Sequence, residues 1–139
     1  MISYNTVGVE MPPIDQPRVS AWVRQVAERY GKKVGDINFI FVSDEEILRI
    51  NREYIQHDYY TDHIGFDYSS GNVLSGDVFI GVETVASNAE LIGETYRREL
   101  HRVIIHGVLH LCGIKDKTPE LHMQMEAAEN AALALAVWL

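Results

Sequence analysis

A helix that ends in a tight reversal is predicted by one stretch, His106-Gly107-Val108-Leu109-His110-Leu111-Cys112-Gly113-Ile114-Lys115-Asp116. His106 and His110 are four residues apart, so both imidazoles project from one helical face and can bind the same ion. Gly113 suits a left-handed helix cap, and a chain reversing there brings Asp116 back over the imidazoles. Two nitrogens and one carboxylate, with a fourth position open to water, are typical of a catalytic zinc site. We therefore expect His106, His110 and Asp116 to hold one zinc ion.

Apolar periodicity around this stretch predicts the rest of the fold. Strands are expected at 2–9 and 36–42, and a hairpin at 60–68 and 73–82 turns through 69–72. Helices are expected at 18–30, from Ser43 to about Ile55, at 82–91, at 97–112, and from Thr118 to the C-terminus. The order predicts an α+β fold: a small mixed sheet of about four strands packed with about five helices, with the metal ligands on a central helix.

Length and composition narrow the class of protein. The 139 residues suit one domain, 1–139, that buries a core of its own. The single cysteine, Cys112, excludes an internal disulfide and fits a reducing compartment. Neither a secretory signal nor an apolar run of roughly 20 residues is visible, so we expect a soluble, cytoplasmic protein with no membrane partner.

The charge distribution points to a localised anion-binding surface. The net charge is −8, which argues against a broad basic face that coats nucleic acid, and weak binding to duplex DNA is expected. Residues 97–117 nevertheless carry five basic and two acidic side chains. The candidates for contact with nucleic-acid phosphate are Arg97, Arg98, Lys115 and Lys117. The alternative is that alternating charges solvate the outer face of a helix.

The chemistry predicted for the ion is phosphodiester cleavage. A helical zinc protease has a Glu directly after its first His as general base, and this chain has Gly107 there. Zinc polarises a phosphoryl oxygen and activates bound water, while nearby cations stabilise the charge that develops on the phosphate. The basic segment around the predicted site supplies such cations.

The chain resembles the YbeY family of zinc-dependent endoribonucleases, which act in maturation of small-subunit ribosomal RNA. The matching positions, in order and at matching spacing over nearly the whole chain, are Ile50-Asn51 with Tyr54, Asp58, Thr61-Asp62, Phe66, Gly76-Asp77-Val78 and the run from His106 to Gly113. The resemblance implies a single-strand-directed endoribonuclease that matures the 3′ end of 16S rRNA, takes part in ribosome quality control, and meets the small ribosomal subunit and its proteins.

Two positions depart from the family pattern. The third ligand of the family is usually the His of a Gly-Tyr-Asp-His ending, whereas here Asp116 takes that place. Ile55 stands where the family usually has an Arg after Tyr54 that acts in catalysis. Candidates for that missing function are Arg52, Arg102 and, as a distant base, Glu99. A non-catalytic, metal-containing ribosome-assembly factor therefore remains the alternative, ahead of a zinc metalloprotease.

Each of the other polar candidates has a functional and a structural interpretation. Asp62 and Asp77 either orient the ligand imidazoles from behind or cap strand ends and turns. Three further histidines could contact RNA phosphate or act as acids near neutral pH. The alternative is that they lie on the surface without a role. They are His57, His63 and His101. Tyr59-Tyr60 suits base stacking or a packed rim.

Overall fold

A four-stranded mixed sheet lies at the centre of the fold, in a computed structural model that describes residues 1–55 and 61–139. The strands are β1 (Ile2–Val7), β2 (Lys33–Val42), β3 (His63–Asp67) and β4 (Val73–Gly81), in the spatial order β1-β2-β4-β3. β2 runs parallel to both β1 and β4, and β3 pairs antiparallel with β4 across the predicted hairpin. The α+β prediction is confirmed, and β3, which carries part of the candidate site, is an edge strand.

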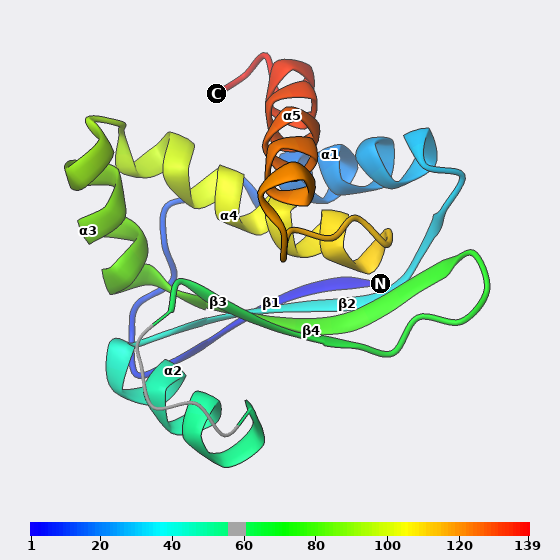
Figure 1. Cartoon of the computed structure of the whole chain (residues 1–139). Coiled ribbons are helices and arrows are strands. Elements are labelled where there is room, and N and C mark those ends of the chain that lie inside the picture. Colours follow the sequence, from blue (N-terminus) through cyan, green and yellow to red (C-terminus); the bar gives the residue numbers. More distant parts are fainter. Residues whose placement is uncertain (56–60) are drawn as a thin grey trace.

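Helices cover both faces of this sheet (Figure 1). α1 (Gln16–Arg29) and α4 (Tyr96–Leu111) lie on one face, and α5 (Pro119–Leu135) packs on α4 from the outside. α3 (Val82–Ile92) leads from β4 into α4. α2 (Asp44–Ile50), which continues into a turn of π-helix, η1 (Asn51–Ile55), lies on the other face. α4 is thus the central helix, as predicted.

Local sequence signals explain most element boundaries. The Ser43 hydroxyl accepts a hydrogen bond from the Glu46 amide and so caps α2. The Glu46 carboxylate accepts a hydrogen bond from Arg49. α1 begins at Gln16, two residues before the predicted start, because Asp15 caps it by accepting from the Arg18 amide. Proline in the first turn of α1 is compatible with this early start.

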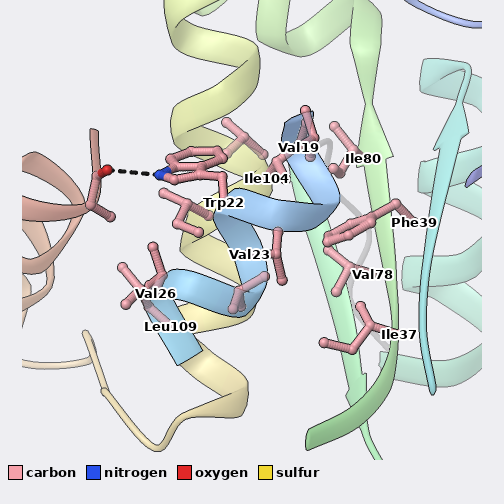
Figure 2. Close-up of a cluster of buried hydrophobic side chains, with 14 of the residues drawn as sticks. Val19, Trp22, Val23, Val26, Ile37, Phe39, Val78, Ile80, Ile104 and Leu109 are labelled. Carbon is pink, nitrogen blue, oxygen red and sulfur yellow. Dashed lines mark hydrogen bonds between the residues drawn. The ribbon is translucent and has the colours of Figure 1, made fainter. Parts of the chain in front are cut away.

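The main core lies between α1, α4 and the sheet (Figure 2). Trp22 of α1 is 2% exposed, and its indole N–H donates to the carbonyl of Ala132 in α5 over 2.8 Å, which ties these helices together. α4 approaches β4 so closely that a Cβ on Gly107 would lie 2.7 Å from Cγ1 of Val78. Gly107 therefore allows the close helix–sheet contact that fixes the height of His106 and His110 above the sheet.

Within the described ranges, 1–55 and 61–139, none of the helices is long and apolar enough to span a membrane.

Candidate metal centre

The predicted reversal after α4 brings three polar groups together. Gly113 has φ 98°, a left-handed conformation that suits glycine, and the chain turns back there. Oδ2 of Asp116 lies 3.4 Å from Nε2 of His106 and 3.4 Å from Nε2 of His110. The closing turn thus places Asp116 over both imidazoles, as its spacing in the sequence predicts.

These separations fit a shared metal ion. Zinc bonds to nitrogen and oxygen are about 2.0–2.2 Å long, so neighbouring ligand atoms of a tetrahedral site lie roughly 3.3 Å apart. Nε2 of His106 is buried, and within the described residues it has no hydrogen-bond partner. Buried polar atoms nearly always have a partner, and a metal ion bound here would supply one. The donor set therefore fits zinc.

Glu129 of α5 controls the other nitrogen of His106. Oε2 of Glu129 lies 2.5 Å from Nδ1 of His106, and the residue is only 4% exposed. A carboxylate at Nδ1 favours the tautomer with the proton there, which leaves the lone pair on Nε2 for a metal. Sequence reasoning missed Glu129. The available signal was an acidic residue within the buried stripe of α5, between Met125 and Leu133.

Arg102 and Glu99 belong to the same buried ionic network. Nε of Arg102 donates to Glu99 over 2.7 Å, and its Nη1 donates to Glu129 over 3.0 Å. Burial alone would raise the pKa of Glu129, but the hydrogen bond with His106 and the charge of Arg102 outweigh burial and lower it. The pKa of Arg102 is raised by its hydrogen bonds with Glu99. Arg102 and Glu99, two of the three predicted catalytic candidates, thus help to hold the Glu129 carboxylate against His106.

Asp62 and His63 come from the start of β3. Oδ1 of Asp62 lies 2.8 Å from Nδ1 of His63, so Asp62 orients an imidazole, although not one of the two on α4. Burial alone would raise the pKa of Asp62, but the hydrogen bond with His63 and nearby positive charge lower it. Ligand nitrogens of His63, His106 and His110 all lie within 4.8 Å of one another. Spacing along the chain did not indicate that His63 belongs to this group.

A cavity of about 470 Å³ opens beside the cluster. Its lining includes His63, His110, Asp116 and Lys117, and a neighbouring hollow adds Lys115. Two of the four predicted RNA contacts therefore stand next to the candidate metal ligands.

The other two predicted RNA contacts lie at the far end of α4. Arg97 is 13 residues before His110, which corresponds to roughly 20 Å along a helix. Arg97 donates to the carbonyl of Trp138, and Arg98 lies 3.8 Å from Glu94. The structure does not bring Arg97 and Arg98 to the metal centre.

Two further candidates lie away from the imidazoles. Arg52 of η1 lines a hollow with residues of α2 and the end of β1. Asp77 points to the α2 face of β4, where it meets the Tyr68 hydroxyl, whereas its neighbour Val78 contacts α4. The side chain of Ile55 lies outside the described part of the chain. The same holds for residues 56–60, which include His57, Asp58 and the Tyr59-Tyr60 pair.

The chain is similar to known proteins over nearly its whole length. Residues 7–136 match the model of the family described as endoribonuclease YbeY. The chain is 60% identical over 135 residues to endoribonuclease YbeY of Phocaeicola vulgatus, covering 97% of this chain and 98% of the relative. It is 56% identical over 134 residues to the protein of the same name in Bacteroides thetaiotaomicron, covering 96% and 98%.

A solved structure supports the fold. The solution structure of TM1509 from Thermotoga maritima superposes with a TM-score of 0.66 at 24% identity, covering 96% of this chain and 90% of the other. The predicted resemblance is confirmed, and the chain belongs to the YbeY family of endoribonucleases.

Proposed function

We propose that this protein is a zinc-dependent endoribonuclease whose ion is held by His106, His110 and Asp116. The observation that carries the proposal is the convergence of two imidazole Nε2 atoms on one carboxylate oxygen, each at 3.4 Å, beside an open cavity. A bound zinc ion would polarise a phosphoryl oxygen and activate a water molecule. One ion per chain satisfies the three donors.

The surrounding residues position the ligands or bind the substrate phosphate. Glu129 holds the proton on Nδ1 of His106 and so directs Nε2 toward the ion. Arg102 and Glu99 position Glu129 from behind. Lys117, on the cavity wall, and Lys115 beside it supply positive charge for the substrate phosphate, where cations stabilise the developing negative charge. Arg97 and Arg98 would contact RNA only beyond the cavity.

The biological substrate we propose is single-stranded RNA at the 3′ end of 16S rRNA. Maturation of that end and ribosome quality control would place the protein in the cytoplasm with the small ribosomal subunit and its proteins. The support is membership of the endoribonuclease family and a local cluster of lysines on an otherwise acidic chain. A general RNA-coating role would require a broad basic face instead.

Cleavage of single-stranded RNA by the purified protein tests the activity. Cleavage should stop when a chelator removes the metal, return with added zinc, and be absent in His110→Ala. Cleavage that persists in His110→Ala would indicate a contaminating nuclease. No metal-dependent cleavage by the wild type would favour the non-catalytic assembly factor.

The cellular function requires a separate experiment. A strain lacking the protein should accumulate 16S rRNA precursors with unprocessed 3′ ends, and the wild-type gene should restore processing while the His110→Ala gene should not. Full restoration by His110→Ala would show that cleavage by this site is not needed for maturation.

A further inference from the structure

A third imidazole reaches the metal centre from the sheet. His63 lies on β3, and its ring centroid is 4.4 Å from that of His106 and 5.9 Å from that of His110. Its ligand nitrogen belongs to the group of three within 4.8 Å, and its side chain is 23% exposed. His63 also lines the cavity beside the site, together with His110 and Asp116. His63 therefore stands on the side of the site that opens to this cavity.

The hydrogen bond to Asp62 prepares His63 for coordination. Asp62 lies 2.8 Å from Nδ1 of His63, just as Glu129 lies against Nδ1 of His106. A carboxylate on one ring nitrogen fixes the proton there and raises the basicity of the other nitrogen, which is the usual arrangement behind a metal-bound imidazole. Two imidazoles of one cluster thus carry the same carboxylate support, from different elements of the fold.

We propose that His63 is a fourth protein ligand of the ion held by His106, His110 and Asp116. The inference rests on the proposed metal site and adds one donor to it, giving three imidazoles and one carboxylate. The three ligand nitrogens lie within 4.8 Å of one another, so bringing His63 to the roughly 3.3 Å spacing of tetrahedral zinc ligands needs a movement of at most about 1.5 Å. β3 is an edge strand with one neighbour, so such a movement disturbs little of the sheet.

The extra donor has a chemical consequence. Four protein ligands fill a tetrahedral zinc site, whereas three leave one position for water or substrate. In the resting protein His63 would therefore hold the position that a substrate oxygen needs. The site would retain its ion more firmly than three donors allow.

Proton NMR of the cobalt-substituted protein counts the bound imidazoles directly. Each imidazole bound through Nε2 should give one strongly shifted, exchangeable Nδ1–H signal, and carboxylates on His63 and His106 should slow exchange of theirs. We expect three such signals in the wild type and two in His63→Val, in which valine suits a strand. The zinc dissociation constant of His63→Val, measured by chelator competition, should rise at least about tenfold.

Two further variants keep the test decisive. His122→Ala removes an exposed imidazole of α5 outside the cluster and should keep all three signals and the zinc affinity. Asp62→Asn retains His63 but weakens its support, so zinc affinity should fall about tenfold even if His63→Val folds poorly.

The outcomes separate this inference from the proposed function. Two shifted signals in the wild type, with zinc affinity unchanged in His63→Val, would overturn the role of His63 and leave the three-donor site intact. Failure of the wild type to take up cobalt or zinc would overturn the three-donor site itself, and the role of His63 with it.

Discussion

The two nitrogens of His106 face regions of opposite character. Nδ1 faces Glu129, Arg102 and Glu99, whose charges are paired with one another at 2.5–3.0 Å. Nε2 faces the imidazole of His110 and the carboxylate of Asp116, and it has no hydrogen-bond partner among the described residues. The paired side therefore positions the ring, while the nitrogen without a partner among the described residues is available for a metal.

The largest expected effect is the loss of stability when the network on the Nδ1 side of His106 loses Arg102. Arg102→Met leaves Glu99 and Glu129, both under 5% exposed, without their shared partner. We expect the free energy of unfolding, measured with urea, to fall by about 3 kcal/mol. This is the low end of the range for a broken buried ion pair, because Arg102 is itself 31% exposed.

Arg98→Met is the matched control on the same helix. Arg98 and Glu94 are exposed and 3.8 Å apart, so this change should cost about 0.5 kcal/mol or less. Equal losses in the two variants would contradict the distinction between a buried positioning network and a solvated surface pair.

A smaller but more specific effect is expected from Glu129→Gln. The amide keeps the shape of the side chain but loses the charge that holds the proton on Nδ1 of His106. Zinc affinity, measured by chelator competition, should fall about 10–100-fold. Glu126→Gln, on the exposed face of α5, should leave zinc affinity unchanged. If both variants bound zinc like the wild type, Glu129 would have no positioning role.

His101 has one property in common with the metal-site residue His106. Its Nε2 is also buried without a hydrogen-bond partner among the described residues, and its Nδ1 lies 2.6 Å from the carbonyl of Arg97. Its ring packs against Trp22 and Trp138, however, and it is not part of the metal-capable group. A lone nitrogen without a partner is therefore not sufficient for a metal site; converging donors are also needed.

His101 should instead affect acid stability, and this is the smallest expected effect. Burial lowers the pKa of His101 below its ordinary value of 6.5, and the positive charge of Arg97 lowers it further. The hydrogen bond to the Arg97 carbonyl raises the pKa but is outweighed by burial. The unfolded chain then binds more protons than the folded one as the pH falls below 6.5, so stability present above that value is lost in acid. The slope should not exceed about 1.4 kcal/mol per pH unit.

His101→Phe provides the reference for that measurement. The difference in unfolding free energy between wild type and His101→Phe should be constant above pH 7 and shift against the wild type as the pH falls below about 6.5. A difference that is independent of pH would mean that His101 titrates alike in the folded and unfolded chain.

The sequence predicted the parts of the site that depend on local geometry. His106, His110, Gly113 and Asp116 lie within one helix end and its turn, where helical spacing and a left-handed glycine determine the positions. The order of strands and helices also followed from periodicity, although the stretch after Ser43 divides into α2 and η1 instead of forming one helix.

The parts that depend on long-range packing were not predictable from spacing. Glu129 reaches His106 only because α5 crosses α4, 23 residues later in the chain. His63 reaches the site because of the face that β3 presents in its register with β4, where His63 lies opposite Ile80. Charge pattern alone presented Arg102 and Glu99 as catalytic candidates, since it cannot show that they pair with each other.

The metal content per chain shows whether His106, His110 and Asp116 bind an ion together. Elemental analysis of the purified wild type should find about one divalent ion per chain, preferably zinc. Asp116→Ala should lose most of it, Asp116→His should retain it because imidazole is also a zinc ligand, and Lys117→Ala on the cavity wall should be unaffected. Full metal occupancy in Asp116→Ala would contradict the proposed three-donor site. The carboxylate placed 3.4 Å from both imidazoles would then not be a ligand.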